Sequence, residues 1–192
     1  MSEITAQSTI EEVAAIVSDA LESAGITATL SGGSAVTIYS NNQYLSRDLD
    51  FVTSAMIVDL KPVLEGLGFE HTGVPRQSQF RHPEVEWYVE FPPSPLSFGH
   101  LHVDPKDCAV INLPVGSLRI ITPTQSVMDR LAAVYAWKDE QSRDQAIMVA
   151  VDQDIDWGAL RTWFENEGES DDEFQRFRES VRSRQDRQTD AL

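Results

Sequence analysis

The sequence predicts an α+β fold: a mixed β-sheet with flanking helices, followed by a helical C-terminal part. Two observations predict this fold class: short strand and helix patterns are interleaved up to position 122, and only helix patterns follow. The length, 192 residues of which 41% are apolar, suffices for one domain with a buried core. We therefore expect an α/β core over 1–122 and a helical part over 123–192, packed as a single compact unit whose last residues fray.

The first helix is predicted over 8–24, where apolar residues recur at helical spacing. Ser8 and Glu11 form a capping-box pattern at its start, and Gly25 supplies a stop. The other predictions are strands over 27–31, 48–53, 69–72 and 85–91, a polar, turn-rich segment over 76–83, a long loop to about position 106, a hairpin from 108–113 and 117–121, and helices over 34–39, 57–67, 123–137, 141–151, 156–167 and 173–184.

The chain is strongly acidic, with 31 Asp and Glu against 15 Lys and Arg and a net charge of −16. This charge disfavours a broad nucleic-acid surface, because Lys and Arg are what bind phosphate backbones, although a nucleic-acid end can enter a local site. No apolar run approaches the roughly 20 residues that span a bilayer, and the N-terminus lacks signal-peptide features. Cys108 is the single cysteine, so we expect a cytoplasmic protein without membrane contact.

Two aspartates, Asp48 and Asp50, lie in the second predicted strand. Residues two apart in a strand point the same way, so both carboxylates share one face. Adjacent carboxylates repel each other unless a divalent cation or an arginine lies between them. An apolar strand that presents two aspartates beside the glycine turn Gly32-Gly33 suggests Mg²⁺ and a phosphate.

The segment GGSAVTIY followed by SRDLDF resembles the signature of the nucleotidyltransferase fold, the superfamily of polymerase-β-like transferases. Its pattern is a glycine pair with Ser or Thr opening a short helix, an Asp-x-Asp strand, and a third carboxylate on a neighbouring strand. The segments YVEFPPSPL and IITPTQSVMDRLAAVYAWKDEQSRDQA are similar to an uncharacterised branch near the AbiEii-type toxins and minimal nucleotidyltransferases. The resemblance covers roughly 27–150 and implies binding of a nucleoside triphosphate with Mg²⁺.

Within this resemblance, the glycine pair and the residue after it are the expected nucleotide-binding element. Gly32 and Gly33 let the backbone approach the triphosphate where a side chain would collide. Ser34 lies at the start of the short helix, where free N–H groups and the helix dipole attract phosphate, and its hydroxyl is a further donor.

Asp48 and Asp50 are the expected ligands of Mg²⁺, with a second ion binding alongside the substrate. Glu90 is the expected third carboxylate, because it lies on the polar face of a strand whose other face is apolar. Its implied role is to bind the second ion and to help deprotonate the acceptor hydroxyl. Glu86 shares that face and is the alternative to Glu90.

A basic residue at the start of a later helix is a further shared feature. By the resemblance, Arg130 faces the triphosphate and Asp144 matches a later acidic position. One departure concerns the residue four positions before the first Asp, which is often Arg in toxin-like relatives and is Tyr44 here. Arg47 adjoins the aspartates but points to the opposite strand face. Fewer basic side chains are therefore available to bind phosphate than in those relatives.

Each assignment has a structural alternative. Gly32-Gly33 can be a tight turn alone, Ser34 an N-cap, Asp48 and Asp50 a solvated strand edge paired with Arg47, Glu90 an exposed strand residue, and Arg130 with Asp144 a surface ion pair.

Two function classes follow. The first is a Mg²⁺-dependent nucleotidyltransferase that moves a nucleoside monophosphate to a hydroxyl of a protein, an RNA end or a small molecule, which the resemblance links to toxin–antitoxin systems. The second is a binding module of the same fold, either a nucleotide sensor or an antitoxin-like partner. The departure at Tyr44 is the main support for the second class.

Overall fold

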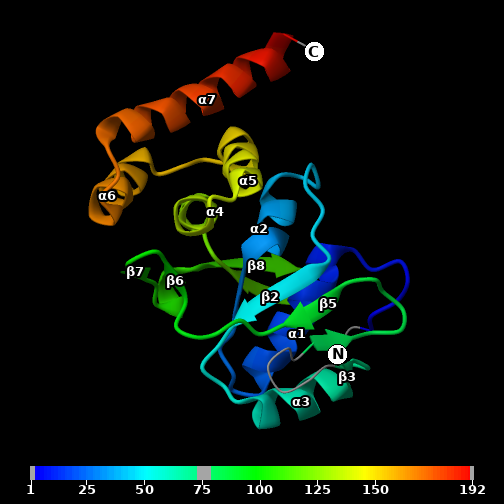
Figure 1. Cartoon of the computed structure of the whole chain (residues 1–192). Helices are drawn as coiled ribbons and strands as arrows, with labels where there is room; N and C mark the ends of the chain where they lie inside the picture. The colour runs from blue at the N-terminus through cyan, green and yellow to red at the C-terminus, as the bar shows by residue number, and fades with distance from the viewer. Residues whose placement is uncertain (1–2, 73–78, 191–192) are drawn as a thin grey trace.

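A computed structural model describes residues 3–72 and 79–190 (Figure 1). Its sheet has the strand order β3-β4-β5-β2-β1-β9-β8, and a two-stranded sheet, β6-β7, lies beside it. The strands are β1 (Thr29–Ser31), β2 (Asp48–Val52), β3 (Glu70–Thr72), β4 (Gln79–Arg81), β5 (Tyr88–Glu90), β6 (Ser97–Phe98), β7 (Leu101–His102), β8 (Ala109–Leu113) and β9 (Gly116–Ile120). The helices are α1 (Ile10–Ser23), α2 (Gly32–Tyr39), α3 (Ile57–Gly66), α4 (Pro123–Trp137), α5 (Glu140–Asp152), α6 (Trp157–Glu167) and α7 (Asp171–Asp190), with a short 3-10 turn at Pro105–Asp107.

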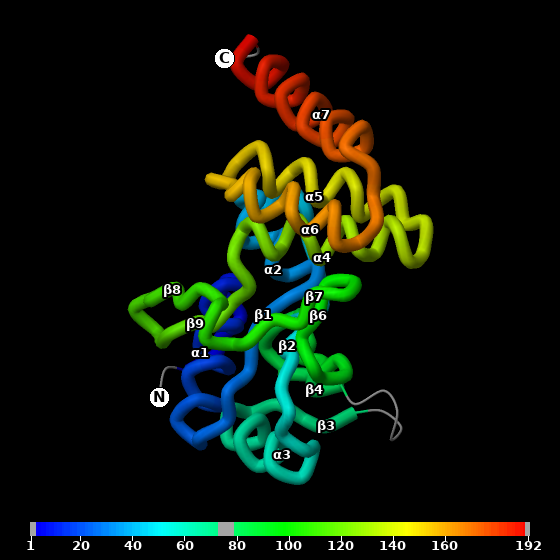
Figure 2. Tube along the Cα trace, turned by 90° about the vertical axis from the view of Figure 1, so that its left-hand side faces the viewer, coloured from blue at the N-terminus to red at the C-terminus, as the bar shows by residue number. Residues whose placement is uncertain are grey.

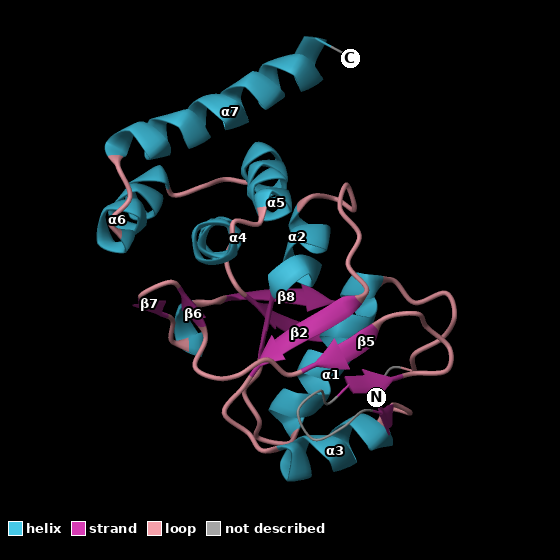
Figure 3. Cartoon of the chain, in the orientation of Figure 1, coloured by secondary structure: helices cyan, strands magenta, loops and turns pink. Residues whose placement is uncertain are grey.

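The order of helices and strands confirms the predicted α+β class, with a mixed sheet and a run of helices at the C-terminal end. Figure 3 shows the strands gathered between α3 at one end of the molecule and α4 to α7 at the other. The view turned by a quarter in Figure 2 shows the same succession, with α7 farthest from the sheet. Helices α4 and α5 both pack against α2, which joins the helical part to the sheet. The described ranges contain no helix that is both long and apolar enough to cross a membrane.

The centre of the sheet separates apolar from polar side chains along each strand. Leu49, Phe51, Phe80 and Val89 have no exposed surface, and they alternate with polar residues of β2, β4 and β5. Each such burial stabilises the fold by about 1.5–3 kcal/mol relative to exposure. Because a one-residue slip would turn these side chains to the other face, the core fixes which face the polar residues occupy.

The start of α1 differs from the prediction by two residues, and its cap by one. Thr9, not Ser8, is the N-cap: its hydroxyl accepts from the Glu12 N–H at 3.3 Å, and the Glu12 carboxylate accepts from the Thr9 N–H at 3.0 Å. The Ser8 side chain is instead buried and accepts a hydrogen bond from the Thr5 N–H. The Ser8–Glu11 capping box was therefore wrong, since a preceding turn already uses that hydroxyl.

Three short strands lie where the sequence predicts turns or loop. β4 falls in the segment 76–83, of which 76–78 lie outside the described residues, and β6 and β7 fall in the expected long loop. These strands have two or three residues each, too few for alternation to identify a strand from the sequence alone, and β4 exists because β3 and β5 pair with it on both sides. The last helix, α7, is longer than predicted at both ends.

Candidate active site

Three carboxylates converge where β2 and β5 lie side by side. The two strands pair in parallel, with Asp50 opposite Glu90 and Asp48 opposite Tyr88. One carboxylate oxygen each from Asp48, Asp50 and Glu90 lies within 4.8 Å of the others. All three side chains are partly buried, so the group sits at the surface of the sheet and is accessible to a small ligand. The structure thus brings together the three acids that the sequence singled out.

The environment of Asp50 opposes its negative charge. Burial, followed by the charges of Asp48 and Glu90, raises the pKa of Asp50 from 3.8 to about 7. Asp48 accepts a short hydrogen bond from the Ser46 hydroxyl, and Glu90 accepts one from the Gln79 amide. Among the described residues, no hydrogen-bond donor reaches the Asp50 carboxylate. A partly buried carboxylate between two others, without a donor, is an arrangement that a bound cation stabilises.

The glycine pair forms the first turn of α2, which begins at Gly32 and not at Ser34 as predicted. Gly32 has φ +67°, and a Cβ built there would collide with Asp50 Oδ2. At Gly33, a Cβ would meet the Ser46 hydroxyl oxygen at 2.9 Å. The bare backbone at the helix start therefore lies directly against the acid cluster, which is more than a tight turn requires.

We expect Gly32→Ala to lower the free energy of unfolding by at least about 2 kcal/mol. A left-handed φ costs an L-residue roughly 1–2 kcal/mol, and the new methyl group would also displace the Asp50 side chain. Chemical denaturation measures the loss. The matched control is Gly66→Ala, whose new methyl group meets no atom within 4 Å; Gly66 is the last residue of α3, and Ala is the better helix former. Equal stability of the two variants would contradict the expectation.

Ser34 is placed differently from the expected phosphate donor. Its side chain is fully buried, and its hydroxyl donates to the Ser31 carbonyl at 3.1 Å. The N-cap of α2 is Ser31, whose hydroxyl donates to the Asp50 carbonyl at 3.4 Å. The first-turn amides of α2, and not the Ser34 hydroxyl, are the groups suited to phosphate.

Arg130 lies close enough to the acid cluster for its charge to act on Asp50. Its guanidinium donates to Asp129 from Nε at 3.0 Å and from Nη2 at 2.6 Å, and to Gln145 of α5 at 3.4 Å. The side chains of Arg130 and Asp129 are both 18% exposed, so this is a largely buried ion pair. Asp144 is exposed, and the structure shows no ion pair between it and Arg130 in the described part of the chain.

Two other predicted residues lie apart from the cluster. Glu86 precedes β5 and pairs with Arg47 at 3.9 Å, and both side chains are mostly exposed. Arg47 therefore does not pair with the aspartates.

The ring of Tyr44 lies beside Gly33, at 3.3 Å from the position a Cβ would take. The residue that replaces the arginine of toxin-like relatives thus borders the glycine turn.

Ser46, Gln79 and Asp129 belong to the site and are absent from the sequence prediction. The sequence could have indicated Ser46, because it lies two residues before Asp48. If the strand is extended by two residues, Ser46 faces the same side as Asp48. The sequence could not have indicated Gln79 in this way, because β4 itself was not predicted. Asp129 adjoins Arg130 in sequence, and adjacent helix residues do not ordinarily face each other.

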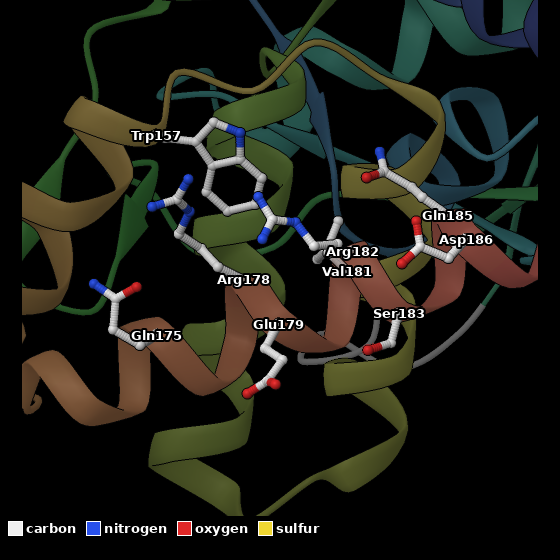
Figure 4. Close-up of a pocket in the computed structure, with 9 residues that line it drawn as sticks. All are labelled: Trp157, Gln175, Arg178, Glu179, Val181, Arg182, Ser183, Gln185 and Asp186. Carbon is white, nitrogen blue, oxygen red and sulfur yellow. The ribbon is translucent and has the colours of Figure 1, made fainter.

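A separate pocket lies along α7, away from the acid cluster. It is formed by Trp157 and one face of α7, and Arg178 stacks on the Trp157 ring at 5.3 Å from its centroid (Figure 4). None of the carboxylates of the cluster lines it. Its aromatic and guanidinium groups are already in contact with one another, so we assign the candidate active site to the cluster on β2 and β5.

The donor set of the cluster fits Mg²⁺. All three side chains offer carboxylate oxygens, the hard ligands that this ion prefers, and few protein ligands leave positions for water and phosphate. No nitrogen or sulfur ligand accompanies them in the described residues, which disfavours a structural zinc site.

No protein-family model and no curated protein matches the sequence. Among solved structures, an antigenic nucleotidyltransferase-like protein from Paracoccidioides brasiliensis is 14% identical over 73% of this chain and 75% of that chain, with a TM-score of 0.53. The lincosamide antibiotic adenylyltransferase LnuA is 18% identical over 73% of this chain and 98% of that chain, with a TM-score of 0.48. The antibiotic-resistance factor ANT(2'')-Ia is 10% identical over 91% of each chain, with a TM-score of 0.49.

At these identities the first of these likenesses shows the fold and nothing finer. The chain has a nucleotidyltransferase-like fold, as its glycine and aspartate motifs predicted.

Proposed function

We propose that this protein is a Mg²⁺-dependent nucleotidyltransferase, which transfers a nucleoside monophosphate from a nucleoside triphosphate to an acceptor hydroxyl. The observation that carries the proposal is the convergence of Asp48, Asp50 and Glu90 directly against the glycine start of α2. Three carboxylates supply the cation site, and the free amides of the helix start supply a phosphate site beside it. The fold supports the same reading.

Each residue of the candidate site has its own role in the proposed reaction. Bound Mg²⁺, as one or two ions, would neutralise the triphosphate and stabilise the attacking and leaving oxygens. Asp48, Asp50 and Glu90 would hold the metal, and the first-turn amides of α2 would orient the phosphates. Glu90 accepts the proton of the acceptor hydroxyl as its oxygen bonds to the α-phosphorus. The bond from the α-phosphorus to the bridging oxygen breaks, and pyrophosphate leaves.

The acceptor is a protein side chain, an RNA end or a small molecule. The net charge of −16 favours a protein or a small molecule, because a long phosphate backbone would be repelled.

The test is incubation of the protein with triphosphates labelled at the α-phosphate, Mg²⁺, and cell extract as the source of acceptors. We expect label to move to an extract component only with Mg²⁺ and only with intact Asp48. No transfer by the wild type, or equal transfer by Asp48→Ala, would contradict the proposal.

A second candidate function is a nucleotide-binding module that does not turn over, such as a nucleotide sensor or the protein partner in a toxin–antitoxin-like pair. It is favoured by the ion pair of Arg130 with Asp129, because the arginine whose charge acts on Asp50 already has a carboxylate partner, and by Tyr44 in the place of an arginine. Calorimetry separates the two: triphosphate binding without any label transfer supports the module.

A further inference from the structure

The strand β4 carries two polar residues on the same face as the acid cluster. Antiparallel pairing places Gln79 opposite Glu90 and Arg81 opposite Tyr88. Phe80, between them, is fully buried and anchors the strand. Since β5 also pairs with β2, one row across three strands runs from Asp50 through Glu90 to Gln79.

These side chains form a hydrogen-bonded chain that ends on the Glu90 carboxylate. The Arg81 Nη2 donates to Gln79 Oε1 at 3.0 Å, and the Gln79 Nε2 donates to Glu90 Oε1 in a short hydrogen bond. Arginine offers only donors, so the amide oxygen must face Arg81 and the amide nitrogen must face Glu90. The donor on Arg81 and the acceptor on Glu90 therefore determine the orientation of the Gln79 amide.

Arg81 is itself held in place. Its guanidinium lies over the Tyr88 ring at 4.6 Å from the centroid, a cation–π contact. Tyr88 belongs to β5, two residues before Glu90, and faces the same side of the sheet. This series of side-chain contacts therefore starts at Tyr88 and ends at Glu90, both on β5, and Gln79 connects Arg81 to Glu90.

We propose that Gln79 is a positioning residue for Glu90 and that Arg81 fixes Gln79 for this task. The amide holds one carboxylate oxygen of Glu90 on the side away from Asp50, which leaves the other oxygen for the cation. This inference rests on the proposed function, because it assigns Glu90 to the metal. Partners of this kind orient metal ligands, and their loss typically weakens metal affinity about 10- to 100-fold.

The experiment measures Mn²⁺ binding to the full chain by calorimetry, because Mn²⁺ accepts the same oxygen ligands. The variants are Gln79→Met, Glu90→Gln, the double variant, Arg81→Met and Asp50→Asn. Gln175→Met, an exposed substitution of the same kind on α7, is the control. We expect Gln79→Met to weaken binding about tenfold, Arg81→Met to weaken it less, and Gln175→Met to leave it unchanged.

The double variant distinguishes positioning from a general structural role. If Gln79 acts through Glu90, Gln79→Met has no further effect once Glu90→Gln is present. A structural role would weaken binding in both backgrounds, and that result would overturn the inference. Wild-type affinity in Gln79→Met together with lost affinity in Asp50→Asn would also overturn it, while leaving the proposed function intact. Equal binding by Asp50→Asn and wild type would overturn both.

Discussion

Replacing Asp50 by asparagine should lower nucleotidyl transfer about a thousandfold or more while leaving the fold intact. A metal ion contributes several kcal/mol of transition-state stabilisation, and each 1.36 kcal/mol corresponds to a factor of ten in rate. Asp50 is the central member of the cluster, and it is the one whose carboxylate lacks a hydrogen-bond donor among the described residues. The amide of asparagine keeps the size of the side chain and removes the charge that holds the cation.

The measurement is label transfer by wild type and Asp50→Asn under identical Mg²⁺ and triphosphate concentrations. Asp59→Asn is the matched control, because Asp59 is exposed on α3. A thermal melt of each variant in a metal chelator checks folding. Transfer by Asp50→Asn at the wild-type rate would show that the reaction does not run through this cluster.

The stability of the metal-free protein should fall as the pH rises from about 4 to about 7, because of Asp50. The folded-state pKa of Asp50 is raised from 3.8 to about 7 by burial and then by Asp48 and Glu90. Between these values the folded protein binds a proton that the unfolded chain has released, so proton binding favours the folded state most at low pH. The free energy of unfolding then falls by up to about 1.4 kcal/mol per pH unit, and this contribution is gone above pH 7.

Asp50→Asn isolates this contribution, because other acidic groups also destabilise a chain of net charge −16. Denaturation in a metal chelator across this range should show wild type losing stability relative to Asp50→Asn as the pH rises. Saturating Mg²⁺ should restore wild type at pH 8 and have little effect on Asp50→Asn, because a ligand stabilises only the state that binds it. Parallel pH curves for the two proteins would contradict the raised pKa.

The sequence predicted the elements that are long or motif-bearing. The alternation in DLDF and in the strand around Glu90 placed three acids on polar strand faces, and parallel pairing of β2 with β5 brings them together. The fold class and the nucleotidyltransferase-like fold are confirmed. The closer kinship with AbiEii-type toxins and the roles of the site residues stay predictions.

What the sequence did not predict depends on contacts between distant segments. β4 has three residues, too few for alternation to identify a strand from the sequence, and its pairing with β3 and β5 makes it a strand. Gln79 and Arg81 could not be placed beside Glu90 without that strand. The burial of Ser34 and the capture of Arg130 by Asp129 are likewise set by packing, which motif spacing does not encode.

Because β2 and β5 pair in parallel, the candidate active site is built from two separate stretches of the chain. Parallel neighbours require the intervening chain to run back to the end of the sheet where the first strand began, and α3, β3 and β4 lie in that connection. The glycine turn and the aspartate pair therefore come from one continuous stretch of chain, whereas Glu90 and its supporting residues come from another. Changes of length in the connecting segment can therefore move Glu90 and its neighbours without disturbing the stretch that carries Gly32 and Asp48, so these two parts of the site can vary independently.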